Sequence, residues 1–592
     1  MKHCACAIIL LAVLFPAQLF AQTDTVDVPD FFASGEGTLN AAITAKITAG
    51  TLSKTVFRLK PYGLYVLSAT ITVPAGKKLT IVAPDPGRTQ ETAPPMICWT
   101  PSGGVTTRYN FDCFGDIYLK NIWILYATTN TTGIGTQVGS ALEIEEDSTD
   151  HVNLGVFENV MFDYSPCPQS SGGSVEVSAS HARLSFRNCY FRNCTDSHFR
   201  YYGRAVSFPF GTSGWHIDSL SFENTTFANM GYVYMQEGAE WGDYVTFNHC
   251  TFLNTIQFTL ESGWWHWLSV TNSIFVNAYM FGHSGSETST PNGGTVNIDS
   301  IGTPNFNFSV PFTESQRHIL FANNSYYIEK WLRDYMAPRS ASNPAGGNRY
   351  SDTASSYNIP RPQPMMSEKT LAFFRNKTAW PYISMRSNYD STDPGFLIPP
   401  TNQVGIKSFL LRKWTDNSDT TWAFDPNSDI NQVWPVNEQL RYSNSTLKTA
   451  GMGGFPLGDL SRWWNSQPTI YANWKAQSAT ENQTITNWLT NGISTGIDDM
   501  QTVLPATYEL SHNYPNPFNP TTEISYSVPQ RSSVSLKVFN VLGMEVATLF
   551  SGVQDAGKHV ATFDAARFSS GVYFYRLESG SVTITKKMVL MK

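Results

Sequence analysis

The segments LSFRNCYFRN (184–193), LSFENTTFAN (220–229), VTFNHCTFLN (245–254) and LSVTNSIFVN (268–277) repeat one template in the middle of the chain. In each copy an apolar, polar, apolar run leads to Asn or His, and then to Phe and a second Asn at constant spacing. Alternation with period two predicts a strand, whereas a helical repeat would show an apolar stripe with a period of about 3.6 residues. The copies are separated by segments of different lengths, so we expect one structural rung per copy with loops between rungs.

The constant template also predicts how the strands pair. Strands that carry the same inward residues in every copy are expected to stack in parallel, with neighbouring rungs about 4.8 Å apart. The sequence therefore predicts an all-β chain built around a parallel β-helix. Inside the stack we expect a ladder of aromatic rings formed by Phe191, Phe227, Phe252 and Phe275.

Two columns of Asn mark the corners between the strands. Asn tolerates the left-handed backbone conformation that a corner needs, and stacked Asn side chains can hydrogen-bond from rung to rung. We expect one column to be Asn159, Asn188, Asn224, His249 and Asn272, and the other to be Asn193, Asn229, Asn254 and Asn277.

The N-terminal part of the chain predicts a cap and the first rungs. TLNAAITAKITAG (38–50) is typical of a short amphipathic helix with Thr38 as N-cap, and such a helix would cover the open end of the stack. The strands that follow, VFRLKPYGLYVLSATITVPAGKKLTIVAP (56–84), resemble the first coils of the pectate-lyase-like superfamily. This resemblance covers roughly residues 30–330 and implies a right-handed parallel β-helix, in a superfamily that contains lyases, hydrolases, adhesins and structural proteins. We expect this domain, with its capping helix, at residues 22–335.

The composition and the first residues bear on localisation and partners. MKHCACAIILLAVLFPAQLFAQ (1–22) predicts a secretory signal peptide at residues 1–21. No later stretch reaches the roughly 20 apolar residues of a membrane span. A net charge of −7 argues against nucleic acid and anionic membranes as partners. Few charges and many Tyr, Trp and Asn residues favour a neutral or weakly charged polymer such as a polysaccharide as partner, and are equally typical of a large β protein.

The C-terminal part changes character at Leu504, where regular short strands with turn signals predict a small β-sandwich at 504–592. The motifs YPNPFNPTT (514–522), VFNVLGMEV (538–546), GVYFYRL (571–577) and KKMVLMK (586–592) resemble the type A sorting domain of the bacterial type IX secretion system. The resemblance implies an immunoglobulin-like domain, contact with the type IX machinery, and release from the cell or attachment to its outer surface.

The segment between these two parts is less regular. Residues 336–503 predict a loop-rich extension with final β-helix coils or a cap, followed by a linker. Within it GFLIPP (395–400) and IKSFLL (406–411) are interpreted as strands.

The tryptophan-rich stretch ESGWWHWLSV (261–270) is a candidate binding surface. The rung register places Trp267 on the outside of the stack beside Tyr244, and it aligns Trp264 with Trp241 one rung back. Two adjacent outward columns of rings would suit the apolar faces of sugar rings. In the alternative interpretation these rings are packed under neighbouring loops.

Four polar residues near the ends of successive strands are candidates for catalysis: Arg200, Glu237, Glu261 and His283. Such a set can abstract a proton next to a uronate or cleave a glycoside by acid/base chemistry. Calcium is the candidate cofactor, because carboxylates would hold it during uronate elimination. DPNSDIN (425–431) imitates the start of a calcium loop, but Ile430 and Val436 replace the Gly and Glu of such loops.

A further aligned polar column consists of Asp218, Asp243 and His266. Two motif sets of the superfamily's enzymes are absent, namely the paired aspartates with Gly-His-Gly of the pectin hydrolases and the Arg-x-Pro-x-x-Arg of the pectate lyases. The sequence therefore leaves two classes of function open. One is a lyase or glycosidase that binds and cleaves an extracellular polysaccharide, and the other is a non-enzymatic adhesin or structural surface protein.

Overall fold

A computed structural model describes most of the chain. The chain divides into two compact units, residues 1–496 and 497–592, except that residues 387–389 group with the second unit. The residues that the structure describes are 24–99, 109–125, 140–146, 153–163, 173–195, 203–208, 216–236, 241–257, 259–262, 264–281, 294–301, 310–337, 339, 344, 346–347, 362–415, 422, 424, 433–464, 468–493, 508–513, 515–529, 532–554, 557–580 and 582–592. The predicted signal peptide, residues 1–21, lies outside them.

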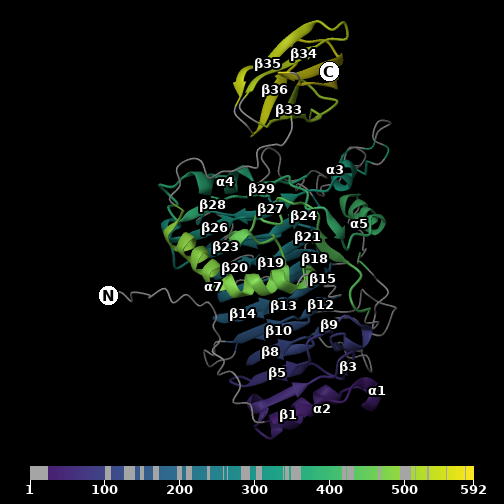
Figure 1. Cartoon of the computed structure of the whole chain (residues 1–592), viewed down its shortest axis with the longest axis vertical. Helices are drawn as coiled ribbons and strands as arrows, with labels where there is room; N and C mark the ends of the chain where they lie inside the picture. Colours follow the sequence, from purple (N-terminus) through teal and green to yellow (C-terminus); the bar gives the residue numbers. More distant parts are fainter. Residues whose placement is uncertain are drawn as a thin grey trace. The chain divides into compact units, whose positions relative to one another are not determined.

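Three long parallel sheets of eleven, ten and eight strands form the first unit (Figure 1). Sheet A contains β1 (Asp24–Asp27), β2 (Thr55–Arg58), β5 (Lys78–Val82), β8 (Asp116–Lys120), β11 (Leu154–Glu158), β14 (Ala182–Arg187), β17 (His216–Glu223), β20 (Trp241–Asn248), β23 (Trp265–Thr271), β26 (His318–Ala322) and β28 (Ile383–Arg386). Sheet B contains β3 (Leu64–Leu67), β6 (Met96–Trp99), β9 (Trp123–Leu125), β12 (Met161–Asp163), β15 (Tyr190–Cys194), β18 (Thr226–Met230), β21 (Thr251–Thr255), β24 (Ile274–Val276), β27 (Ser325–Tyr327) and β29 (Tyr389–Asp390). Sheet C contains β4 (Ile71–Val73), β7 (Phe111–Cys113), β10 (Leu142–Glu145), β13 (Gly173–Ser178), β16 (Arg204–Ser207), β19 (Tyr232–Gln236), β22 (Leu260–Ser262) and β25 (Val296–Ile298).

The predicted parallel β-helix is confirmed by this topology, because the chain visits the sheets in turn and each strand pairs with its equivalent on the next rung. The predicted aromatic ladder is confirmed as well. The stacked ring centroids are 5.2 Å apart for Phe191 and Phe227, 5.2 Å for Phe227 and Phe252, and 4.3 Å for Phe252 and Phe275. All of these rings are fully buried.

Both Asn columns occupy left-handed corners, as predicted, with φ between 49° and 61° at every member, His249 included. In the second column the amides bond in series. The side-chain amide nitrogen of Asn229 donates to Asn193 over 3.2 Å, that of Asn254 to Asn229 over 3.1 Å, and that of Asn277 to Asn254 over 2.9 Å. The column therefore fixes the register of four successive rungs.

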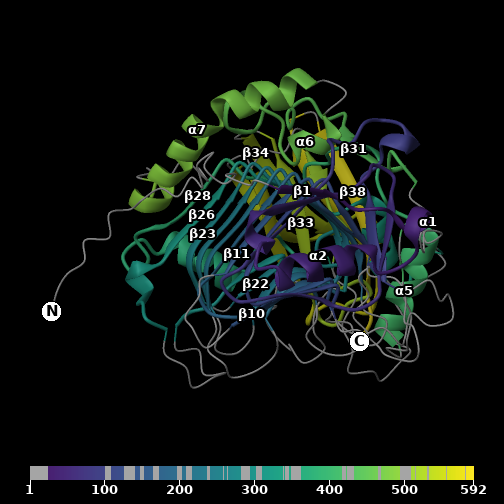
Figure 2. The same ribbon diagram turned by 90° about the horizontal axis from the view of Figure 1, so that it is seen from below.

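Each end of the stack is covered by a helix. α2 (Thr38–Thr48) buries Leu39 and Ile43 at the N-terminal end, where Figure 2 shows it across the opening. Gly37, in the left-handed conformation, is its N-cap, so the prediction that Thr38 caps the helix is wrong by one residue. At the other end α4 (Glu368–Arg375) buries Phe373 and Phe374 in the same core. The other described α-helices that precede residue 433 are α1 (Phe31–Ser34), α3 (Lys330–Met336) and α5 (Gln403–Thr415).

The predicted strand IKSFLL is wrong, because it lies inside helix α5, where Ile406, Phe409 and Leu410 are buried at helical spacing. The other predicted strand of this segment, GFLIPP, contains β30 (Phe396–Ile398), which pairs antiparallel with β31 (Gln439–Tyr442).

The chain then returns along the outside of the rungs it has already built. We call the described residues 433–464 and 468–491 the return segment; it contains β31, α6 (Leu460–Trp463) and α7 (Pro468–Asn491). Asn323 donates to the carbonyl of Ala450, and Arg462 donates to Asn159 over 3.4 Å several rungs earlier. α7 then runs back over sheet A to the rung of His318, whose Nδ1 lies 2.8 Å from the carbonyl oxygen of Leu489 (Figures 1 and 2).

The second unit is an antiparallel β-sandwich, as predicted. One sheet contains β32 (Glu509–Leu510), β33 (Thr521–Val528) and β36 (Gly557–Asp564), and the other contains β35 (Glu545–Gln554), β34 (Ser532–Phe539), β37 (Gly571–Ser579) and β38 (Val582–Leu590). Inward residues of both sheets, such as Ile524 and Leu536, form its separate core.

Candidate functional site

The four predicted catalytic residues fall largely outside the described part of the chain. Arg200, Glu237 and His283 belong to segments that the structure does not describe. Of Glu261 only the backbone is described, in β22 of sheet C, where it pairs with Met235 on β19. The segment 425–431, the imitation of a calcium loop, also lies outside the described residues.

The first predicted aromatic column, Tyr244 and Trp267, points outward as expected, but helix α7 packs against it. Tyr244 pairs with Trp267 across β20 and β23, and both side chains point away from the core. However, the ring of Trp267 stacks on His318 with centroids 3.6 Å apart. The rings of Tyr244 and Trp267 also pack against an apolar cluster that contains Ile485 of α7. Helix α7 packs against these two rings, but both remain partly exposed, so their display to a polysaccharide stays a prediction.

In the second aromatic column, Trp241 and Trp264 differ in how far their side chains are exposed. Trp264 is only 7% exposed, so it is packed rather than displayed. Trp241 is partly exposed, and its ring lies parallel to that of His216 on the previous rung, with centroids 4.6 Å apart. Trp241 is thus partly exposed, as Tyr244 and Trp267 are, and only Trp264 of the predicted set is buried.

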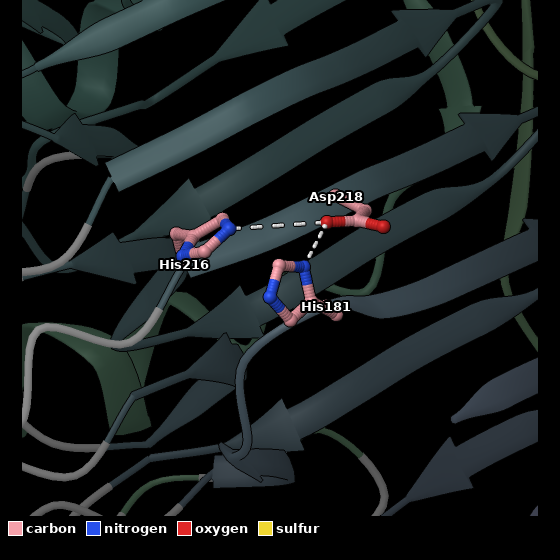
Figure 3. Close-up of side chains that lie close together, drawn as sticks. All are labelled: His181, His216 and Asp218. Carbon is pink, nitrogen blue, oxygen red and sulfur yellow. Dashed lines mark hydrogen bonds and ion pairs between the residues drawn. The ribbon is translucent and has the colours of Figure 1, made fainter. Parts of the chain in front are cut away.

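Beside Trp241 the predicted polar column joins two histidines that the sequence analysis did not single out. His181 Nδ1 lies 3.0 Å from Asp218 Oδ1, and His216 Nε2 lies 3.9 Å from the same oxygen (Figure 3). His216 Nε2 also lies 3.8 Å from Asp243 Oδ2, and His266 Nδ1 lies 3.1 Å from Asp243 Oδ1. We call these five residues the His–Asp ladder. It follows the edge of sheet A where the strands begin, and every member has an exposed side-chain fraction of 17% or more.

The backbone explains why the ladder forms. Ala182 pairs with Ile217 and Arg183 pairs with Ser219, so β17 carries one extra residue, Asp218, relative to β14. An extra residue of this kind re-aims a side chain. His181 precedes β14 in the left-handed conformation, with φ of 62°, which is uncommon for a residue with a side chain. Together these two irregularities bring His181 and Asp218 within hydrogen-bonding distance.

The electrostatics of the ladder favour neutral imidazole at its centre. Burial lowers the pKa of His216, and the nearby carboxylate of Asp243 acts in the opposite direction. Arg183 donates to Asp218 Oδ2 through Nε and Nη2, at 3.2 and 3.1 Å. This leaves Oδ1 of the same carboxylate to the two histidines.

Sheet C carries a second cluster, which we call the carboxylate cluster: Asp112, Glu143 and Glu145. One carboxylate oxygen of each lies within 4.8 Å of the others. Asp112 pairs with Glu143, and Glu143 pairs with Glu176 on the next rung, so these acids share one register position. Glu261 occupies the same register position further along the sheet, through Ser207 and Met235.

The close approach of these acids changes their protonation. Burial, followed by Glu143 and Asp112, raises the pKa of Glu145 to about 7. Burial and Glu143 also raise the pKa of Asp112. Ser178 donates to Glu143 Oε1 over 2.8 Å, which holds that carboxylate in place. A carboxyl group that titrates near neutrality beside other carboxylates can act as a general acid or base.

The sequence contains signals for both clusters. Acids alternate with apolar residues in LEIEE (142–146) and VEV (175–177), which is typical of outward positions on strands of sheet C. The predicted catalytic set came from the later rungs only, so these earlier ones were missed. His181 precedes its strand and Asp218 sits at an extra residue, so the repeat template alone does not bring them together.

Comparison with known families identifies the second unit. Residues 512–591 match the model of the secretion system C-terminal sorting domain. A search of curated proteins finds no match to the chain. Among the helices that the structure describes, none is long and apolar enough to cross a membrane. The sorting domain makes this a secreted or cell-surface protein that interacts with the type IX secretion machinery.

Proposed function

We propose that this secreted or cell-surface protein, a parallel β-helix that carries a type IX sorting domain, binds and cleaves an extracellular polysaccharide along the outer face of sheet C. The observation that carries the proposal is the carboxylate cluster, in which Glu145 titrates near pH 7 beside Glu143 and Asp112. Groups with strongly shifted pKa values gather at functional sites, where a proton has to move.

In this proposal Glu145 gives a proton to the glycosidic oxygen, and an ionised neighbour supports the positive charge that develops on the sugar. Carboxylate oxygens within 4.8 Å of one another leave little room for a water between them. Inverting glycosidases need about 6.5–9.5 Å between their carboxyl groups, so the short separation favours a retaining reaction with direct attack by a carboxylate. If the polymer carries uronates, the same group in its carboxylate form can instead take the proton next to the uronate carboxyl in an elimination, and the glycosidic oxygen leaves with a proton from a neighbouring carboxyl or water.

The proposal retains the residues suggested by the sequence. Arg200, Glu237, Glu261 and His283 come from the later rungs, and the backbone of Glu261 shares the register of Glu143. A linear polymer that runs along sheet C would pass from the carboxylate cluster to the strand of Glu261. Calcium remains a candidate cofactor at the later positions.

The test is the full-length chain incubated with a panel of neutral and uronate-containing polysaccharides. New reducing ends report hydrolysis, and unsaturated products that absorb ultraviolet light report elimination. We expect Glu145→Gln to lower the rate by about 100-fold or more, as loss of a general acid does, while Glu36→Gln, an exposed acid near the N-terminal end, leaves it unchanged. Cleavage that survives in Glu145→Gln but not in a Glu237→Ala, Glu261→Ala double variant would move the reaction to the later rungs.

A non-enzymatic adhesin is the second candidate function. It is favoured by the return segment, which buries outward residues of sheets A and B and so makes a reinforced rod. For an adhesin, both product assays stay silent with the whole panel, and the chain is retained on a glycan array. If the chain forms no products and is not retained on the array, polysaccharide is excluded as the partner.

A further inference from the structure

We propose that the His–Asp ladder binds a divalent transition-metal ion of the zinc type, with His181 Nδ1, His216 Nε2 and Asp218 Oδ1 as ligands. One ligand atom of each of these three residues lies within 4.8 Å of those of the other two (Figure 3). The site lies on sheet A, whereas the carboxylate cluster lies on sheet C, so this inference does not depend on the proposed reaction.

The distances suit a small ion. Zinc lies about 2.0–2.2 Å from nitrogen and carboxylate oxygen, so the ligand atoms of a tetrahedral site are roughly 3.3 Å apart. Asp218 Oδ1 lies 3.0 Å from His181 Nδ1 and 3.9 Å from His216 Nε2, which brackets that value. Small rotations of exposed side chains complete the geometry, because His181 is 54% exposed.

The ligand chemistry selects the class of metal. Two imidazole nitrogens with one carboxylate suit zinc, cobalt, nickel or copper, whereas calcium prefers sites built wholly from oxygen. Asp243 Oδ2 lies 3.8 Å from His216 Nε2 and can approach as a fourth ligand, or water can take that position.

The surroundings hold the ligands in position. Arg183 binds Asp218 through Oδ2 only, as partners behind a metal ligand commonly do, so Oδ1 stays directed at the histidines. The ring of His216 is held parallel to Trp241, with an angle of 1° between the planes. The described charged groups that act here are the acids Asp218, Asp243 and Glu146 and the single guanidinium of Arg183, so the local charge attracts a cation.

The test uses the full-length chain freed of metal by a chelator and titrated with zinc, with bound metal measured after dialysis and affinity measured by calorimetry. We expect one zinc per chain, and a loss of affinity on the order of 100-fold in His181→Ala and in Asp218→Asn. Both positions are on the surface, and an unchanged thermal unfolding midpoint would show that the variants fold. Cobalt in place of zinc should give the visible absorption of a tetrahedral site, and an excess of calcium should not displace it.

A matched control sharpens the assignment. His512→Ala removes an exposed histidine of the sorting domain. This variant should bind zinc like the parent chain. Absence of a dialysis-resistant zinc in the parent, full affinity in Asp218→Asn, or an equal loss in His512→Ala would each overturn the proposal.

Discussion

Two neighbouring columns on the same strands differ in what packs against them. On β20 and β23 the residues Asp243 and His266 belong to the partly exposed His–Asp ladder, and the next residues, Tyr244 and Trp267, pack against the apolar cluster of α7 and stay partly exposed. The outward direction of Tyr244 and Trp267 follows from the rung register. Asp243 and His266 also leave the core, although each is next to an outward residue on its strand, because strict alternation breaks at these positions. The cover on Tyr244 and Trp267 comes from the return segment, so the register alone does not predict which outward side chains are covered.

The largest expected effect comes from loosening α7. Glu481 is buried and accepts hydrogen bonds from Asn248 over 2.7 Å and from Trp474 over 3.1 Å, and its other oxygen lies 3.3 Å from His249 Nε2. Glu481→Ala leaves these buried partners unsatisfied, so we expect the free energy of unfolding to fall by about 3–5 kcal/mol. Chemical denaturation measures this, with Gln477→Ala on the exposed face of α7 as control. A loss below about 1 kcal/mol would mean that α7 is not held by this contact.

Next in size is a comparison of two tryptophans. Trp267 lies between His318 and the apolar residues of α7, so Trp267→Ala should cost about 2–3 kcal/mol, somewhat less than a core tryptophan. Trp241 is partly exposed and stacks on His216, so Trp241→Ala should cost about 1 kcal/mol. Thermal and chemical unfolding of both variants measure the difference. Equal losses would remove the distinction between the column that packs against α7 and the column of Trp241.

A smaller effect depends on pH. Burial lowers the pKa of His318 from its usual 6.5, opposed in part by its hydrogen bond with the carbonyl of Leu489. Below about pH 6.5 the unfolded chain then binds a proton more readily than the folded one, so stability is complete above that pH and falls as the pH drops towards the lower folded pKa. Unfolding measured at about pH 7.5 and about pH 5.5 should show this loss, and His318→Gln should reduce it. An identical pH dependence in that variant would contradict the assignment.

The smallest effect is expected in the ladder itself. Arg183 and Asp218 form an ion pair on the surface, with Arg183 47% exposed. Salt screens such pairs, so Arg183→Ala should change the free energy of unfolding by about 0.2–1 kcal/mol. Chemical denaturation at low and high salt checks this. A loss as large as that of Glu481→Ala would show that the ladder is as important for stability as the contacts of α7.

Much of the fold could be predicted from local sequence. The repeat template specifies the strands, the Phe ladder and the left-handed Asn corners, since each depends on one rung and its neighbours. The sorting domain could be predicted for a similar reason, because its motifs are contiguous.

The rest depends on contacts between distant segments. Helix α7 buries Trp474, Ile485 and Leu489, but the polar Glu481 interrupts that stripe and many Thr and Asn residues surround it, so its sequence resembles a loop. The buried role of Glu481 exists only because His249 and Asn248 lie beneath it. Likewise, His181 and Asp218 meet through an extra residue in β17 that no local pattern announces.

The return segment can pack only after the rungs that it contacts have formed. Glu481 bonds a histidine 232 positions earlier, and Tyr471 bonds an asparagine 283 positions earlier. Rungs can stack on one another as soon as they are synthesised, but Tyr244 and Trp267 gain their apolar partners in α7 only when this last helix of the unit packs. A chain without packed α7 thus exposes more apolar surface on sheet A than the folded protein, and a factor that binds this surface could distinguish the two before export.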